Sequence, residues 1–402
     1  MKTDSFFSFF FSSIAALLIV SCTSGRIEDF KTSLEDAENQ VKPDTLKLCF
    51  AGDIMAHKPN FDMTDYSIIW DDIRAITGSS DFSFANLETT IDDINPAQTY
   101  PKFCVHSSYA DEAVKAGFNV FSLANNHIND YELSGINSTQ SWANKVSNDS
   151  KNSTRTVYFS GLHKKAEPFS YSYIEKNGWK ILFIAVTELL NQYTYTSYIN
   201  FVPPSTKGRA EFMESLKKLR SEHECDIFIL SLHTAETEYE LATTTKQNQY
   251  YLDLLNKADV DIIWANHPHV VKPWSRIYSS KSDKLLMRAN GNTISGQRWQ
   301  PDFSNPSDIK EYTGDSVLLN VVLEKTPADT AYDLQTKKHV QIKSIEPIFI
   351  TTYIDSSWNF IIKRLNHSFI SELEKEGRSD WAKYLKERKK IMKNTKENII
   401  WQ

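Results

Sequence analysis

Five short apolar segments of this chain are each followed by side chains of types that bind metal ions. These side chains are Asp53; Asn86 and Glu88; Asn125, Asn126 and His127; His233; and Asn266, His267 and His269. Carboxylate, amide oxygen and imidazole ligands together suit manganese, iron or zinc better than calcium or magnesium alone. The residue types therefore predict a site for one or two divalent ions.

The apolar segments themselves have the composition of buried strands. They cover residues 46–52, 82–85, 120–124, 227–232 and 262–265, and helical patterns separate them. Short segments rich in Val, Ile, Phe and Leu in this order predict an α/β sheet. Because ligands of open α/β sheets bind outside the carboxyl ends of the strands, we expect the polar ends to form one site. A sixth segment, 284–289, leads to Asn292 and predicts another wall of that site.

Each of these residues also has a purely structural explanation. Asp53 suits a turn, Glu88 suits an exposed loop, and a lone histidine at a strand end is usually hydrogen-bonded and not a ligand. The segment His267-Pro268-His269 is harder to explain in this way, because proline keeps the backbone extended and splays the two imidazoles. The strand ends taken together favour a metal site.

The remaining patterns predict helices, a hairpin and a charged tail. Helices are expected at 64–76, 109–116, 133–146, 207–222 and 246–258. Asn177-Gly178 between segments 169–176 and 179–186 predicts a β-hairpin. Two later strands are expected at 316–323 and 340–353, where Pro347 indicates an edge or an irregularity. Residues 360–400 are highly charged and have helical periodicity, which predicts a helical extension that caps the same domain.

The first 22 residues have the pattern of a targeting signal. Lys2 precedes an apolar stretch, 6–20, that is too short for a spanning helix of a mature protein. The sequence Leu-Ile-Val-Ser before Cys22 resembles a bacterial lipobox, which predicts export and membrane anchoring by acyl chains on Cys22. An uncleaved anchor and an ordinary signal peptide are the alternatives. The polar residues 23–44 are expected to form a tether.

Composition excludes several other classes of protein. The 402 residues carry a net charge of -6, and no basic stripe indicates a nucleic-acid partner. Cys49, Cys104 and Cys225 match no zinc motif, and buried free thiols are the expected state of Cys49 and Cys225. The sequence contains no nucleophile elbow of serine hydrolases, no P-loop and no dinucleotide-binding fingerprint.

The motifs at the strand ends resemble, in their order, those of the CapA-type poly-γ-glutamate capsule-synthesis family. The matching motifs are Gly52-Asp53, Asn86-Leu87-Glu88, Asn125-Asn126-His127 with Asp130, Ser231-Leu232-His233, and His267-Pro268-His269. The family is similar in fold to calcineurin-like metallophosphatases. The resemblance implies an α/β sandwich of two mixed, mostly parallel β-sheets flanked by helices. We expect this domain to cover 45–355, with the helical extension at 356–402.

The resemblance also implies roles for individual residues. Asp53 and His269 would bind a first metal ion, Glu88 would bridge, and Asn126, His233 and His267 would bind a second ion. His127 would be the general acid, with Asp130 as its catalytic partner. The expected substrate-binding residues are Asn86, Asn125, Glu238 and Asn292.

The chain departs from the family pattern in several motifs, among them Ala265-Asn266 before His267-Pro268-His269 where the family has Gly-His, and Glu132 where a glycine is expected after Asp130. Met55 stands where metallophosphatases have a histidine of the first motif, and His57 is either a substitute or a surface residue. The usual His-Trp-Gly is His-Thr-Ala after position 233, which leaves open whether Glu236 or Glu238 supplies the acidic group.

Two main functions are compatible with this pattern. The first is a metal-dependent hydrolase or transferase that acts on an exported anionic polymer, cleaving either a phosphoester or a γ-glutamyl amide. The second is a non-catalytic component that binds or exports such a polymer together with other capsule proteins. Its candidate contacts are Lys102, Lys272, Arg288 and Arg298. An exported phosphoesterase with no capsule role is a third alternative.

Overall fold

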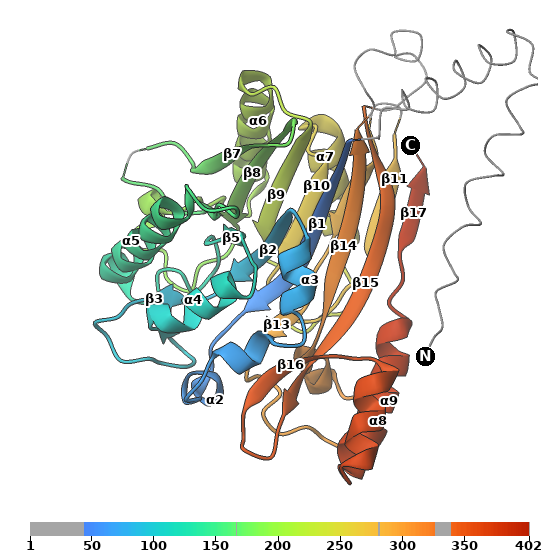
Figure 1. Ribbon diagram of the computed structural model, residues 1–402. Coiled ribbons are helices and arrows are strands. Elements are labelled where there is room, and N and C mark those ends of the chain that lie inside the picture. The colour runs from blue at the N-terminus through green and yellow to red at the C-terminus, as the bar shows by residue number, and fades with distance from the viewer. Residues whose placement is uncertain (1–43, 166, 280–281, 326–338, 402) are drawn as a thin grey trace, which may run out of the picture. The chain divides into compact units, whose positions relative to one another are not determined.

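The computed structural model describes residues 44–401, except 166, 280–281 and 326–338 (Figure 1). The predicted signal peptide, Cys22 and almost all of the predicted tether therefore lie outside the described residues. Within the described part of the chain, no helix combines the length and the apolar character needed to cross a membrane.

Strands and helices alternate through much of the chain. The strands are β1 (Asp44–Ile54), β2 (Phe82–Leu87), β3 (Thr90–Ile91), β4 (Cys104–Val105), β5 (Val120–Ser122), β6 (Tyr158–Ser160), β7 (Tyr171–Lys176), β8 (Trp179–Thr187), β9 (Ile227–His233), β10 (Ile262–Asn266), β11 (Trp274–Tyr278), β12 (Lys284–Met287), β13 (Asn292–Ile294), β14 (Asp315–Lys325), β15 (Val340–Ile354), β16 (Phe360–Arg364) and β17 (Asn398–Trp401). The α-helices are α2 (Lys58–Phe61), α3 (Arg74–Ser79), α4 (Ser107–Lys115), α5 (Glu132–Ser150), α6 (Thr206–Glu222), α7 (Thr245–Lys257), α8 (His367–Lys375) and α9 (Ser379–Lys393).

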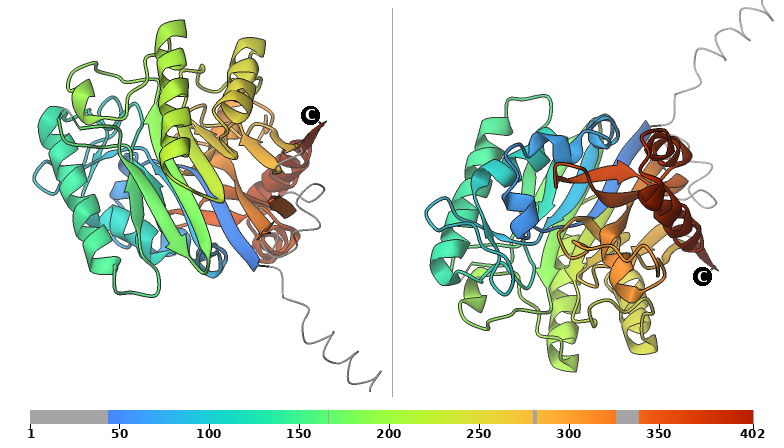
Figure 2. Two further views of the ribbon diagram at one scale, coloured as in Figure 1. Left: turned by 90° about the horizontal axis from the view of Figure 1, so that it is seen from above. Right: turned by 90° about the horizontal axis from the view of Figure 1, so that it is seen from below.

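Two large sheets face each other. The first has the order β16-β15-β14-β1-β2-β5-β6, with β13 also paired to β1, and the second has the order β17-β11-β12-β10-β9-β8-β7. The strands β1, β2, β5 and β6 run parallel, as do β8, β9, β10 and β12, whereas β7, β11, β15 and β16 add antiparallel pairs. Helices α6 and α7 cover the second sheet on its outer side, and α3 and α4 lie on the other side of the sandwich (Figures 1 and 2). The predicted sandwich of two mixed, mostly parallel sheets is confirmed.

Aromatic side chains fill the space between the sheets. Phe50 stacks on Phe84 with ring centroids 4.4 Å apart, and Trp264 of the opposite sheet approaches both rings to about 6 Å. The Trp264 indole N–H donates to the carbonyl of Ala51 over 2.8 Å, so its one polar group is satisfied inside the core. Because both faces of these strands are buried, they form continuous apolar segments instead of alternating ones.

Most sequence-predicted elements are present. The Asn177-Gly178 hairpin joins β7 to β8 with positive φ at both residues, as a two-residue turn between twisted strands requires. Pro347 lies in β15 opposite Leu319 and outside the part of β15 that pairs with β16, which is an edge position for its missing N–H.

The prediction of one helix over 64–76 is wrong. The segment forms a 3-10 turn (Ser67–Trp70) and then the short α3, because the backbone N–H of Ile73 donates to Trp70 three residues back. This tighter winding places Ile69, Trp70 and Ile73 all in the core.

The predicted helical extension at 356–402 is only partly correct. Helices α8 and α9 are present, but β16 precedes them and pairs with β15, and β17 follows them and pairs with β11. In β16, buried Phe360 and Ile362 alternate with half-buried Ile361, a period of two that the surrounding charged helices obscure in the sequence. The segment therefore extends both sheets.

A buried ion-pair cluster fixes α9 to the first sheet. Asp315 accepts from Arg298 Nη1 over 2.9 Å and from Arg388 Nε over 2.7 Å, and all three side chains are almost fully buried. Burial alone would raise the pKa of Asp315, but the two guanidinium groups hold it below its ordinary value.

Replacing this carboxylate should be strongly destabilising. Asp315→Asn leaves two guanidinium groups buried without a counter-charge, which costs about 3–5 kcal/mol of unfolding free energy. Urea denaturation followed by circular dichroism measures the loss. Asp149→Asn, which removes the exposed partner of Lys145, is the control and should leave the midpoint unchanged. Equal midpoints for both variants would contradict the structural role of Asp315.

Candidate metal centre

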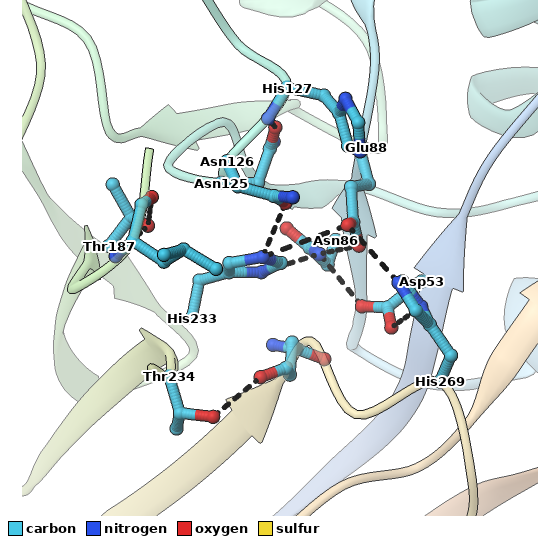
Figure 3. A network of polar contacts seen from close by, with 12 residues as sticks. Asp53, Asn86, Glu88, Asn125, Asn126, His127, Thr187, His233, Thr234 and His269 are labelled. Atoms are coloured by element: carbon cyan, nitrogen blue, oxygen red, sulfur yellow. Dashed lines mark hydrogen bonds and ion pairs between the residues drawn. The ribbon is translucent and has the colours of Figure 1, made fainter. Parts of the chain in front are cut away.

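The register of the strands brings the polar ends together. Asp53 at the end of β1 lies opposite Asn86 of β2 on one side and Asn292 of β13 on the other. His233 at the end of β9 lies opposite Asn266 of β10, directly before the His-Pro-His segment. Parallel strands with aligned ends thus bring Asp53, Asn86 and His233 close together (Figure 3).

Two carboxylates are buried side by side at this point. The Asn86 amide donates to Asp53 Oδ1 over 2.8 Å and to Glu88 Oε2 over 3.2 Å, which holds the two groups together. Glu88 is fully buried, and its Oε1 has no hydrogen-bond partner among the described residues. Burial and the neighbouring charge of Asp53 raise the pKa of Glu88 well above its ordinary value. No Lys or Arg in the described part of the chain is ion-paired with either carboxylate.

Three imidazoles face the carboxylates. His269 Nδ1 lies 3.1 Å from Asp53 Oδ2, and its Nε2 lies 3.6 Å from Glu88 Oε1. Burial lowers the pKa of His269, but the hydrogen bond and charge of Asp53 outweigh it and raise the pKa. Burial lowers the pKa of His233 and His267 well below the ordinary value, so both rings are neutral and have a lone pair for a ligand.

These side chains form two overlapping sets of ligand atoms. One set is Glu88, His267 and His269, and the other is Asp53, Glu88 and His233, with the ligand atoms of each set within 4.8 Å of one another. His267 Nδ1, like Glu88 Oε1, is buried without a hydrogen-bond partner among the described residues. Buried atoms of this kind are costly unless something compensates them. A divalent cation fits, because it would satisfy both atoms and the two negative charges.

Glu88 belongs to both sets, as expected for a bridging ligand. The other ligands divide differently from the expectation, since His267 groups with His269 and Asp53 groups with His233. Asn126 Oδ1 lies 2.9 Å from His233 Nε2 and accepts its N–H, while His233 Nδ1 lies 3.4 Å from the Asn86 amide nitrogen.

His127 and Asp130 form a second pair beside the centre. His127 Nδ1 lies 2.7 Å from Asp130 Oδ2, and the same oxygen accepts the backbone N–H of Phe103 over 2.8 Å. Both side chains are nearly buried. The carboxylate therefore fixes the orientation of the imidazole, and no described residue hydrogen-bonds to His127 Nε2.

Asn191 is a site residue that the sequence analysis missed. Its Oδ1 accepts from Asn126 over 3.2 Å, and its Nδ2 donates to Asp130 Oδ1 over 3.4 Å, so it links the ligand set to the catalytic pair. Asn191 follows the end of β8, so the strand-end rule used for the other five segments would have found it.

Three residues predicted to bind substrate make hydrogen bonds within the site. Asn125 uses its amide on the backbone, donating to Leu87 O over 2.8 Å and accepting from His127 N over 3.1 Å. Asn292 Oδ1 lies 3.0 Å from His269 Nδ1, and the Asn86 amide donates to Asp53 and Glu88. These contacts fix ligand orientation, which is how outer residues tune metal sites.

Glu236 and Glu238, the two candidates for the acidic group near His233, differ in their contacts. Glu236 is ion-paired with Lys272 over 2.9 Å and accepts from Tyr251, so its carboxylate is engaged. Glu238 is half-buried, and its charge adds to the effect of Asp53 in raising the pKa of both Glu88 and His269.

Neither residue of the divergent first motif belongs to a ligand set. Met55 is buried in the core. His57 Nδ1 accepts the backbone N–H of Gly296 over 3.1 Å, and burial lowers the pKa of His57 to about 3, so this ring is neutral. The Nδ1 lone pair of His57 is therefore occupied by Gly296, and His57 lies in neither ligand set.

Neutralising Glu88 separates the stability of the metal-free protein from its affinity for metal. Because the folded pKa of Glu88 lies above the ordinary 4.5, the metal-free protein should lose stability as pH rises through that raised pKa. Glu88→Gln should remove this loss, so the variant unfolds at a higher temperature than wild type at pH 8 in chelator. The same variant should bind Mn²⁺ at least about 100-fold more weakly, because a shared ligand is gone.

Thermal melts across pH measure the stability of the metal-free protein, and isothermal titration calorimetry with Mn²⁺ measures its affinity for metal. Glu188→Gln is the matched control, because that buried carboxylate is paired with Arg209 at 2.6 Å and belongs to neither ligand set. Unchanged Mn²⁺ affinity in Glu88→Gln would contradict the assigned role.

Solved structures with related chain paths were found at low identity. A hypothetical protein from Thermus thermophilus is 14% identical with a TM-score of 0.40, over 76% of this chain and 98% of that one. A protein described as a 5′-nucleotidase from Staphylococcus aureus, in complex with alpha-ketoglutarate, is 13% identical with a TM-score of 0.43, over 83% and 58%. A 5′-nucleotidase precursor, also from Thermus thermophilus, is 12% identical with a TM-score of 0.39, over 77% and 54%. Similarities of this extent carry no statement about activity.

Sequence comparison is more decisive. No curated protein matches the chain significantly. Residues 47–297, more than half of the chain, match the family model of the bacterial capsule synthesis protein PGA_cap, and all the ligand residues described above lie in this stretch. The chain therefore belongs to the bacterial capsule synthesis protein family PGA_cap.

Proposed function

We propose that this protein is a divalent-metal-dependent hydrolase that cleaves a phosphoester or amide bond in a capsule-type polymer of the cell envelope. The observation that carries the proposal is the pair of ligand sets that share Glu88 beside the His127–Asp130 pair. A metal centre next to a carboxylate-oriented imidazole is the arrangement that metal-assisted hydrolysis needs.

The side chains of this centre have distinct tasks. Asp53, Glu88, His233, His267 and His269 would hold one or two ions of manganese, iron or zinc. When bound, the metal would polarise the scissile group and lower the pKa of an attacking water. Asn86 keeps Asp53 and Glu88 in place by donating to both.

The leaving group would receive its proton from His127. Asp130 accepts the Nδ1–H of this imidazole and fixes its orientation, so that Nε2 is the ring nitrogen that would carry the transferred proton. Phe103 packs edge-on against the ring at 4.6 Å and restricts its movement. Asp130 acts through His127 and is a positioning residue.

The contacts of the cationic residues favour hydrolysis over passive binding of a polyanion. Lys272 is buried and paired with Glu236, and Arg298 is buried and paired with Asp315. Arg288 donates to the side chain of Asn248 and to the carbonyl of Pro273. These three side chains are engaged within the protein, which leaves only Lys102 of the expected cationic contacts exposed.

Removing the general acid should slow turnover without removing the metal. His127→Ala should lower kcat by about 10²–10⁴-fold, and Asp130→Asn should lower it less and shift the pH profile, because the tautomer is no longer fixed. The assay compares phosphomonoester, phosphodiester and poly-γ-glutamate substrates, with metal content measured in the same samples. His163→Ala, a buried histidine bonded to Lys164 O, is the control and should keep full activity. Metal-loaded wild type that cleaves no substrate of this panel would refute the proposal.

We propose further that the chain is exported and anchored by lipid at Cys22. The support is the lipobox-like sequence before this residue, which lies outside the described residues. Wild type expressed in a bacterial host should fractionate with membranes, and Cys22→Ser should leave them, because the acyl chains are its proposed anchor. Wild type in the soluble fraction, or Cys22→Ser in the membrane fraction, would contradict lipidation.

A further inference from the structure

An open cleft of about 870 Å³ lies between the segment around α2 and the residues near Trp299 and Trp358. Its volume is in the range of small-molecule binding sites. Two tryptophans, Trp299 and Trp358, line it, and their side chains remain 46% and 55% exposed. Single exposed apolar residues are common on protein surfaces, but two exposed indoles that line the same cleft indicate a binding surface.

The conformation of Trp358 is strained. Its φ is 65°, a left-handed value that is unusual for a bulky residue. Asp355 imposes this turn, because its carboxylate accepts the backbone N–H groups of Ser357 and Asn359 over 2.8 and 2.9 Å, and its own N–H donates to Asn359 O. Strain that the surroundings enforce is typical of functional positions. Here it presents an indole to the cleft.

The loop that carries Trp299 is anchored by several contacts and is also linked to the metal centre. Arg298 is anchored in the core by Asp315 and by two groups of β15. Gly296 lies so close to His57 that an added Cβ would be 2.6 Å from that side chain. Gln297 accepts from Asn292, which in turn contacts His269.

The wall of the cleft reaches close to the general acid. His57 lines the cleft, and its ring packs edge-on against Phe103 at 4.9 Å. Phe103 packs in the same way against His127 at 4.6 Å. A single aromatic ring, Phe103, therefore lies between a residue of the cleft wall and the catalytic pair.

The polar groups of the cleft suit a neutral, hydroxyl-rich ligand and not a polyanion. Lys58 is paired with Asp62 at 2.6 Å, so their charges cancel, and His57 uses Nδ1 to accept a backbone N–H. The hydroxyls of Thr64 and Thr99 make no hydrogen bond within the described residues and are available to a ligand.

We propose that this cleft is a saccharide-binding subsite. The indoles of Trp299 and Trp358 stack on the C–H faces of sugar rings, because the negative face of an aromatic ring attracts partly positive C–H groups. The hydroxyls of Thr64 and Thr99 form hydrogen bonds with the sugar hydroxyls. That the bound saccharide belongs to the polymer cleaved at the metal centre rests on the proposed function; binding in the cleft does not.

The test is a binding measurement on the full-length protein in detergent, with chelator present so that catalysis is silent. The probes are neutral hexasaccharides of glucose, N-acetylglucosamine, galactose, mannose and xylose on an array, with hexa-γ-glutamate as the charged comparison. The tightest ligand is then titrated calorimetrically into wild type, Trp299→Ala, Trp358→Ala and Trp358→Phe. Tyr171→Ala, a 38% exposed ring on β7 outside the cleft, is the matched control.

At least one hexasaccharide should bind wild type more tightly than hexa-γ-glutamate does. Each Trp→Ala change should weaken that binding about tenfold or more, while Trp358→Phe keeps most of it and Tyr171→Ala keeps all of it. Absence of binding to every hexasaccharide, or binding that neither Trp→Ala variant weakens, would overturn the inference. If the protein binds a saccharide but the metal-loaded protein hydrolyses no substrate, the proposed function is refuted and the inference stands. If the protein binds no saccharide but hydrolyses its substrate, at a rate that the tryptophan variants leave unchanged, the inference is refuted and the proposed function stands.

Discussion

The structure depends on two carboxylates that share one buried point. Asp53 and Glu88 are removed from water, lie within reach of the same Asn86 amide, and are ion-paired with no Lys or Arg in the described part of the chain. Two like charges in such a place destabilise the folded state unless one carboxylate is protonated or a cation intervenes. The neutral imidazoles of His233 and His267 supply ligands without adding a competing positive charge, which favours the cation.

The fold positions Asp53 and Glu88 by fixing the ends of the strands that carry or precede them. The parallel pairing of β1 with β2 and of β9 with β10 sets the heights at which the two carboxylates and His233 emerge. The aromatic layer around Phe84 and Trp264 holds the two sheets together at the distance that closes the site. The loop before Trp299 then joins the centre to the neighbouring cleft, since it contributes to both.

The strands and their polar ends could be predicted because a buried parallel strand is a continuous apolar segment in the sequence. The carboxyl ends of parallel strands also lie at the same edge of the sheet. Asn191 was missed because its strand was interpreted only as half of a hairpin. The partners of Lys272 and Arg298 could not be predicted, because Glu236 and Asp315 meet them only after the chain has folded. The strands at either end of the C-terminal helices were hidden for a similar reason, since each is short and gains stability only from a neighbouring strand.

The division of ligands was beyond the sequence as well, because it depends on side-chain positions to within about an ångström. The central claim is that Glu88 is the shared ligand of a divalent metal. Anomalous diffraction from crystals grown with Mn²⁺ tests it most directly. The account predicts one or two strong anomalous peaks within about 2.0–2.3 Å of the Glu88 carboxylate, on the side that faces His269 and His233. A map from Mn²⁺-saturated crystals with no peak near Glu88 would contradict it.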